Sequence, residues 1–577
     1  KMMKQIRGKL IELELPAELK EISSTKIREN IDMNRDISNL IDPVVQEYIY
    51  NNGLYLREPE YKPLIIARAI TFEEADPPYP GIEEELEGTL LAGDPEGPAL
   101  LRALHKSGDK LMILRNHMND NRPVAFARFR YLASEELFGV LGDIRICDMI
   151  RSRTTGDVLL ISGFYAGNRP EIHDAEQLLL TELIMYSFGH RCDYAVFYPE
   201  GGSYTNRVAS AMVRQGFVHP EEAPENTAIY VVDMHAPVML LANMETTLKE
   251  PFSSNERILK VIHNAQQELQ HSMAKLYPGQ LVLSVSASVL YHRMVDKVVQ
   301  MNHVPREVMV PRKLGEMMCV PFGKILRGGV MPNTVTKTIH TDKVYDPDLL
   351  GCSVEAFPNY TPLPTQVKAI KSFDRPVILV DDVLNRSGIR ISTLAPMLRR
   401  EGVDVRKLLV GVMTGYGRDM LASMGLSGDS VYYVPNMRNW FAESSLYPFI
   451  GGDQVRRAET KVAGLEPSIN LIRPYTQPAL EGTTDQAAFE FSACCIRNAR
   501  DVLLVLEQEY RARFARNLTL SRLSEAIILP LCPDRGDCVE YDPNLAASVY
   551  LENDLEMLNR SRANTARTQN YYGERKF

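Results

Sequence analysis

Continuous apolar runs separated by helical patterns predict an α/β fold in the second half of the chain. Residues 377–380 are four aliphatic side chains in a row, which is typical of a strand buried on both faces, and residues 407–413 repeat the pattern. Residues 391–401 have the spacing of a helix, and residues 307–311 predict a further buried strand. Buried strands alternating with helices indicate a parallel sheet.

A different pattern precedes this unit. Residues 110–114 and 124–131 are apolar runs joined by a polar stretch, which predicts a hairpin. Apolar side chains at helical spacing predict a helix over residues 172–188. The other elements expected here are strands at 157–162, 193–198 and 228–232 and a helix at 205–214.

The two ends of the chain add a short module and a helical one. Residues 10–15 have the pattern of a strand, and Thr483 to Gln486 form a capping box before a long helix that reaches about residue 513. We expect the helical part to pack on the third module or to form a homo-oligomer. The expected fold is an α/β multidomain one, with boundaries at 1–57, 58–240, 245–460 and 461–577.

The composition excludes several classes of protein. A chain of 577 residues, 45% hydrophobic and 24% charged, is typical of a globular protein with several domains. A net charge of −9 and a pI near 5.8 argue against a nucleic-acid partner. No apolar run is long enough to cross a membrane. The eight cysteines, none in a CxxC pair, predict a reducing cytoplasm and no metal site.

Two adjacent carboxylates, Asp381 and Asp382, follow the buried strand directly. Buried charges are costly unless something binds them, and ligands bind at the carboxyl ends of strands in open α/β sheets. The stretch resembles the phosphoribosyl diphosphate (PRPP) signature of type I phosphoribosyltransferases. The resemblance implies that the acids hold ribose hydroxyls. It also implies Mg²⁺ with PRPP and a phosphate-binding loop, here Asn385, Arg386, Ser387 and Gly388.

The match to this signature is partial, because Ile389 stands where a hydroxyl is common. The alternative is that the two acids cap the next helix.

Three more positions fit the same resemblance. Arg312 and Lys313 stand beside a glycine after residues 307–311, where the family places the turn that receives the pyrophosphate. Trp440, the only tryptophan, stands where purine phosphoribosyltransferases often carry a base-stacking aromatic residue. Core packing is the alternative role for this tryptophan.

Residues 22–28, Ile-Ser-Ser-Thr-Lys-Ile-Arg, resemble the carboxyl-terminal ATP motif of nicotinate mononucleotide adenylyltransferases, and the likeness continues to residue 55. Hydroxyls at a helix start and a cation one turn later suit phosphates. The resemblance implies that ATP phosphates bind Ser23, Ser24, Thr25 and Arg28. The family's HxGH motif is missing from the sequence, so we assign no catalytic residue and expect more of that domain before Lys1.

The order of elements between residues 110 and 232 resembles the GNAT acyltransferase fold. In that family a strand-loop-helix step binds the pyrophosphate of acyl-CoA through backbone N–H groups. The equivalent residues here are Gly167, Asn168 and Arg169. Pro170 removes one backbone donor, so the sequence leaves both acetyl-CoA binding and its loss open.

Two functional interpretations follow from these resemblances. In the first, the protein is a cytoplasmic transferase of NAD biosynthesis. One module would adenylate a mononucleotide with ATP, and another would join a base to PRPP. In the second, the phosphoribosyltransferase-like and GNAT-like modules sense ligands or act as scaffolds and regulate the adenylyltransferase. The identity of the base and of any acyl acceptor depends on pocket shape, which the sequence does not give.

Overall fold

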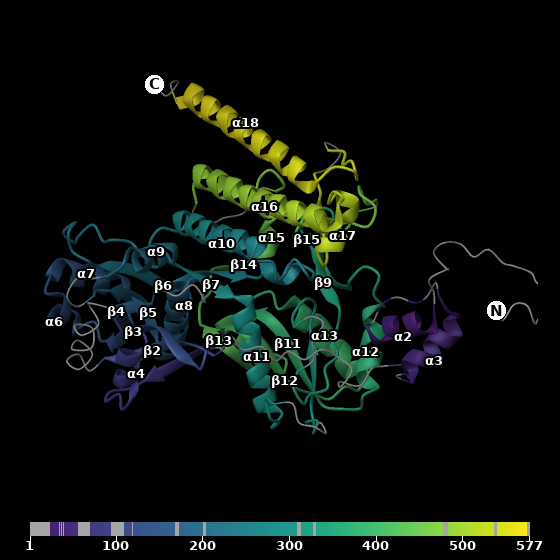
Figure 1. The fold of residues 1–577 in the computed structure, drawn as a ribbon, viewed down its shortest axis with the longest axis horizontal. Helices are drawn as coiled ribbons and strands as arrows, with labels where there is room; N and C mark the ends of the chain where they lie inside the picture. Colours follow the sequence, from purple (N-terminus) through teal and green to yellow (C-terminus); the bar gives the residue numbers. More distant parts are fainter. Residues whose placement is uncertain are drawn as a thin grey trace, which may run out of the picture.

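The computed structural model describes residues 23–573, apart from 34, 36, 38–39, 53, 56–69, 94–108, 118, 168–171, 200–203, 308–312, 327–330, 458, 477–482 and 536–538. Within these residues the chain forms three sheets, of eight, four and five strands, and a layer of long helices (Figure 1). The protein is therefore a mixed α/β protein with several sheets.

The eight-stranded sheet contains the elements expected between residues 110 and 232. The predicted hairpin is confirmed as the antiparallel strands β2 (Lys110–Asn116) and β3 (Arg122–Leu132). The predicted helix is confirmed as α8 (Ala175–Ser187), which packs on the strands. The remaining elements of this part are β1 (Ile70–Ala75), α4 (Ile82–Gly88), α6 (Leu137–Leu141), α7 (Ile144–Arg153), β4 (Asp157–Ala166), β5 (Cys192–Phe197) and α9 (Asn206–Arg214).

The long strand β6 (Tyr230–Ala242) joins this sheet to later parts of the chain. Its first half pairs antiparallel with β5. Its second half pairs in parallel with β14 (Asn439–Ala442) and with β7 (Gln280–Ser286). Both partner strands come from the range assigned to the third module, so the sheet crosses the boundary expected near residue 245.

The second sheet has four parallel strands in the order β13, β12, β11 and β8. The strands predicted at 377–380 and 407–413 fall within β11 (Val377–Leu384) and β12 (Val405–Thr414), and the helix between them is α13 (Ile389–Arg400). The strand predicted at 307–311 lies outside the described residues except for Glu307, which is not in a strand. The other elements are β8 (Met318–Pro321), α12 (Leu363–Lys371), α14 (Gly415–Ser423) and β13 (Gly428–Val434).

Helix α11 (Ala287–Met301) connects the two sheets. Its apolar side chains share one core with residues of β7, β11 and β12. Leu290 is fully buried there, and the backbone of Gly411 in β12 lies so close that a Cβ would be 2.7 Å from this leucine. The helix therefore fixes the parallel sheet against the eight-stranded one.

The third sheet has the order β10, β9, β15, β16 and β17. Its strands are β9 (Thr341–Tyr345), β10 (Cys352–Ala356), β15 (Asp453–Val455), β16 (Glu466–Ile469) and β17 (Leu531–Pro533). The extension expected to be helical thus also supplies β16 and β17. Strand β17 pairs in parallel with β16, which is distant in the sequence. This pairing satisfies backbone hydrogen-bonding groups of both short strands.

The long helices α10 (Glu256–Leu276), α16 (Asp485–Phe514) and α18 (Ala547–Gly573) lie side by side over the sheets (Figure 1). Helix α16 confirms the long helix predicted from the capping box, and the hydroxyl of Thr484 accepts the N–H of Ala487 at its start. This half also contains the short helices α15 (Glu443–Leu446) and α17 (Leu523–Ala526).

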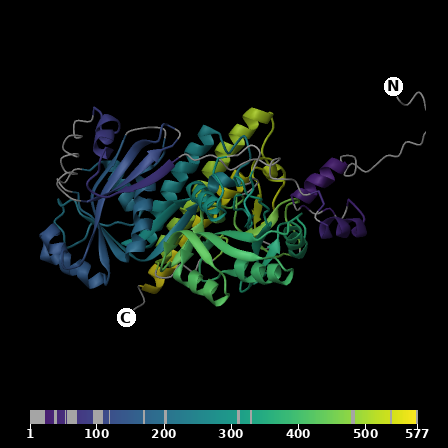
Figure 2. The same ribbon diagram turned by 90° about the horizontal axis from the view of Figure 1, so that it is seen from below.

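Helices α2 (Ser24–Asp32) and α3 (Pro43–Asn51) lie at the opposite end of the molecule from the eight-stranded sheet (Figures 1 and 2). They share a small apolar cluster, and α3 contacts α12. The strand predicted at 10–15 is outside the described residues. Among the helices that are described, none is both long enough and apolar enough to cross a membrane.

Candidate functional site

A cavity of about 130 Å³ lies where the carboxyl ends of β11 and β14 meet the amino ends of β9 and β15. It is lined from β14 and the residues after β6 in the first sheet, from β11 and α13 of the second, and from β9 and β15 of the third. We call it the strand-end cavity. Its polar and aromatic lining includes Asn243, Tyr291, Lys324, Asp342, Asp382, Arg390, Trp440, Ser444 and Asp453.

The predicted acid pair lies at this cavity with an arginine between the two carboxylates. Nη1 of Arg390 is 3.0 Å from Oδ1 of Asp381, and Nη2 is 3.0 Å from Oδ1 of Asp382. Asp382 lines the cavity, whereas the side chain of Asp381 is only 4% exposed. The two acids thus have different surroundings, and only Asp382 is placed to meet a ligand.

Local sequence explains how the arginine reaches the acids. Gly388 adopts a left-handed conformation, with φ of 39°, and starts α13. Arg390 is the second residue of this helix, and long helical side chains point back toward the helix start. The strand, the turn and the helix therefore bring Arg390 back onto the carboxyl end of its own strand.

Burial dominates the electrostatics of the acids around the cavity. Burial raises the pKa of Asp381 to about 7, although the charge of Arg390 acts in the opposite direction. Burial also raises the pKa of Asp453, against the charges of Lys343, Lys324 and Arg390. Lys324 pairs with Asp342, with Nζ and Oδ2 3.2 Å apart. The site thus combines two cations, Lys324 and Arg390, with two acids, Asp381 and Asp453, whose pKa values are raised by burial.

Trp440 forms part of the opposite wall. It lies on β14, in register with Met239 of β6, so its position follows from the parallel pairing of these two strands. The amide oxygen of Asn243, just after β6, accepts the N–H of Ser444 at 2.9 Å. The backbone of Gly451 packs so closely here that a Cβ would lie 2.3 Å from the carbonyl oxygen of Ser444. A larger residue would therefore displace this wall.

The acid behind this wall is Glu443, which is fully buried. Its Oε2 accepts hydrogen bonds from the backbone N–H of Met244, at 3.2 Å, and from Nε2 of Gln266, at 3.0 Å. Burial raises the pKa of Glu443 to about 7. The first turn of α15 therefore holds a carboxyl that can carry a proton near neutral pH.

The loop after the acid pair lies away from the cavity lining. A Cβ at Gly388 would be 2.4 Å from the side chain of Met420, so this turn packs on α14. Arg386 lies over the ring of Tyr416, 5.7 Å from its centroid. The predicted phosphate-binding residues Asn385, Arg386, Ser387 and Gly388 thus stand beside α14, while Asp382 and Trp440 share the cavity.

The cations at the cavity differ from those expected. Arg312 is outside the described residues, and Lys313 is exposed. Lys324 and Arg390 line the cavity instead. Both have a sequence signal, because Lys324 follows the buried β8 and Arg390 opens the helix after the acids. Neither signal fixes where such a long side chain ends, since that depends on how distant parts of the chain pack.

Mg²⁺ is the metal that a PRPP site implies. In the described part of the chain, His, Cys, Asp and Glu side chains form no group of three that could hold a metal ion. Mg²⁺ commonly uses one or two carboxylates together with substrate phosphates. Asp382 fits that pattern, with Mg²⁺ arriving on a diphosphate rather than in a cage made by the protein.

The N-terminal ATP motif forms the start of a short helix. The hydroxyl of Ser23 accepts the N–H of Lys26 as an N-cap, and Ser24 and Thr25 are exposed. Arg28 is exposed and lies 5.2 Å from the ring centroid of Tyr55. ATP binding at these residues stays a prediction.

The loop expected to bind acyl-CoA is only partly described. Asn168 and Arg169 are outside the described residues, and the N–H of Gly167 donates to the carbonyl of Val124. At the start of α8, Asp174 pairs with Arg214 at 2.8 Å and Glu176 pairs with Arg207 at 2.8 Å. Both carboxylates at this helix start are thus paired with arginines, and acetyl-CoA binding stays a prediction.

No family model and no curated protein sequence matches the chain. Among solved structures, it has a weak and partial likeness to NAA60 of Arabidopsis thaliana, solved in complex with acetyl-CoA. The likeness covers 29% of this chain and 99% of that chain, at 15% identity and a TM-score of 0.21. At this level it identifies neither a family nor a function.

Proposed function

We propose that the strand-end cavity binds PRPP, and that the protein is a transferase of nucleotide metabolism that joins the ribosyl group to a flat base. One observation carries the proposal. Asp382, at the carboxyl end of a buried parallel strand, shares a cavity with Trp440 and with two cations, Lys324 and Arg390. This is the end of an open α/β sheet at which ligands bind.

Each of these side chains has a role in such a reaction. Asp382 accepts hydrogen bonds from ribose hydroxyls. The cations neutralise the departing diphosphate as the ribose carbon gains positive charge. Mg²⁺ bound to the diphosphate supplies further neutralisation of its charge. The ring of Trp440 offers a flat apolar surface for the base, and stacking on an aromatic side chain is worth about 1–3 kcal/mol per base.

Sensing without catalysis is the second candidate function. Arg390 already pairs with both acids, and the cavity of about 130 Å³ is smaller than the 300–1,000 Å³ or so typical of ligand sites. A site that must open before it holds PRPP suits a module that reports on ligand concentration. Adenylation of a mononucleotide rests on the sequence resemblance alone and stays a prediction.

Calorimetric titration with Mg-PRPP tests the proposal. Wild-type protein should bind, and Asp382→Asn should weaken binding about tenfold or more, because a hydrogen bond to a charged group is worth about 1.5–3 kcal/mol. Asp404→Asn is the matched control, since Asp404 is exposed at the opposite, amino end of β12. Turnover of PRPP with a base separates the transferase from the sensor. If wild type and Asp382→Asn bind Mg-PRPP equally well, both candidate functions, transferase and sensor, lose their basis.

A further inference from the structure

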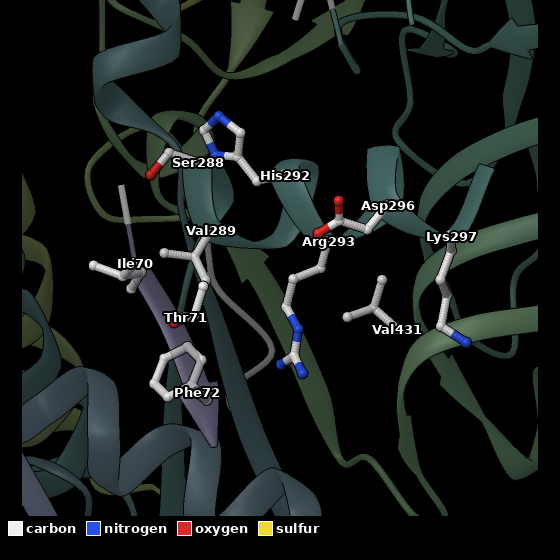
Figure 3. Close-up of a pocket in the computed structure, with 10 residues that line it drawn as sticks. All are labelled: Ile70, Thr71, Phe72, Ser288, Val289, His292, Arg293, Asp296, Lys297 and Val431. Atoms are coloured by element: carbon white, nitrogen blue, oxygen red, sulfur yellow. The ribbon is translucent and has the colours of Figure 1, made fainter. Parts of the chain in front are cut away.

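A second, larger cavity lies on the other side of α11. It has a volume of about 310 Å³ and is lined by β1, α11 and β13, so it sits between the eight-stranded sheet and the parallel sheet (Figure 3). Its volume falls in the range of small-molecule sites, roughly 300–1,000 Å³. We call it the inter-sheet cavity.

Arg293 is held rigidly in this cavity. Its Nη1 donates to both carboxylate oxygens of Glu182, at 2.7 and 2.6 Å, and to the hydroxyl of Tyr432, at 2.7 Å. The guanidinium carbon is 5.0 Å from the ring centroid of Tyr432 and 5.8 Å from that of Phe72. Figure 3 shows the side chain extending from α11 into the space between Phe72 and Val431.

This arrangement leaves donors for a ligand. All hydrogen bonds that Arg293 makes within the described residues use Nη1, so its Nε and Nη2 make none there. A planar guanidinium binds carboxylate and phosphate oxygens through two such nitrogens at once. Because Glu182 and two rings already fix the side chain, little conformational entropy is lost when a ligand binds.

The rest of the lining matches a ligand with a flat apolar part and one acidic group. Apolar contacts come from Ile70, Phe72, Val289 and Val431. Lys297 is a second cation at the rim and pairs with Asp429, whose side chain is 49% exposed. The acid of the lining, Asp296, pairs with Arg306. A ligand anion would therefore lie between two cations, Arg293 and Lys297. In the described lining, the one carboxylate, Asp296, already has a cation partner.

We propose that the inter-sheet cavity binds a small ligand consisting of a flat ring that bears one acidic group, a carboxylate or a phosphate monoester. The acid would bind Arg293 and Lys297, and the ring would lie against Phe72 and Val431. The proposal does not depend on the function of the strand-end cavity, because it uses different side chains and a different ligand.

Titration of the whole chain with three probes tests the proposal. Benzoate and phenyl phosphate carry the two acidic groups, and benzamide is the neutral isostere of benzoate. At least one acidic probe should bind saturably at millimolar concentration, and the tighter of the two identifies the acid. Benzamide should bind about tenfold more weakly or worse than benzoate, the size of one charge-assisted hydrogen bond. Failure of both acidic probes to bind would overturn the proposal, as would equal binding of benzamide.

Three variants locate the binding. Val431→Trp fills the cavity and should abolish binding, while Val213→Trp, on the exposed face of α9, should not change it. Lys297→Met removes the rim cation and should weaken the acidic probes at least threefold or so with little effect on benzamide. Unchanged binding of the acidic probe by Val431→Trp, in protein that unfolds at the wild-type temperature, would place the probe elsewhere and contradict the proposal.

Discussion

The guanidinium of Arg390 lies 3.0 Å from the carboxylate of Asp382, near the carboxyl end of β11, where this strand lines the strand-end cavity. The same guanidinium is 3.0 Å from Asp381. The protein itself thus already supplies one positive charge to the acid pair. A ligand that uses Asp382 has to draw Arg390 toward its own negative charge, and a diphosphate can do so.

Replacing Arg390 by Gln should destabilise the protein by about 3 kcal/mol at pH 8, because the buried Asp381 loses its counter-charge. The loss should be smaller at pH 5, where Asp381, with a pKa near 7 even in the wild type, is protonated. Urea unfolding at both pH values measures this. Arg400→Gln, an exposed change on the same helix, is the control. A second change, Asp381→Asn, should restore part of the stability, and a lack of rescue would contradict the pairing.

Glu443→Gln should stabilise the protein at pH 8. The pKa of Glu443 is raised from 4.5 to about 7 in the folded state, so the folded protein binds this proton more tightly than the unfolded chain does. Stability therefore falls as pH rises from about 4.5 to 7, and an uncharged side chain avoids the loss. The gain should be on the order of 3 kcal/mol at pH 8 and less than about 1 kcal/mol at pH 5. The same gain at both pH values would show that ionisation is not its cause.

Glu182→Ala should destabilise the protein by about 1–3 kcal/mol, because the hydroxyl of Tyr432 and the guanidinium of Arg293 lose a hydrogen-bond acceptor. Tyr432→Phe removes a hydroxyl that donates to Glu182 at 2.6 Å and accepts from Arg293. The double variant should lose less than the sum of the single losses, with a coupling of about 0.5–3 kcal/mol. Additive losses in chemical denaturation would mean that the three side chains do not act together. Glu135→Ala, at an exposed acid, should have no comparable effect.

Acetyl-CoA should show no saturable binding in calorimetry at millimolar concentration. The start of α8 carries Asp174 and Glu176, both already paired with arginines, and the N–H of Gly167 is used within the sheet. A dissociation constant in the micromolar range or below would show that the loop before α8 supplies donors that outweigh these acids.

Much of the fold was predictable from local patterns. Strands buried on both faces, such as β11 and β12, are continuous aliphatic runs, and α16 begins at its predicted cap. The pairing of β14 with β6 was not predictable, because it joins segments about two hundred residues apart. Strands β9 and β10 were missed since their side chains are mostly polar and only part-buried.

The same limit applies to the strand-end cavity. Asp382 was found because two acids after a buried strand are conspicuous, and Trp440 because of its place relative to them. Lys324 and Arg390 were not assigned to the site. Their long side chains reach the cavity through tertiary packing, which no local pattern encodes.

The most direct test of PRPP binding uses the fluorescence of Trp440. This is the only tryptophan of the chain and it lines the strand-end cavity, so its emission reports on that site alone. Titration with Mg-PRPP should change the emission saturably in the wild type. The change should be lost in Asp382→Asn and kept in Asp404→Asn. No change in wild-type emission at millimolar Mg-PRPP, or the same change in Asp382→Asn, would contradict the proposed site.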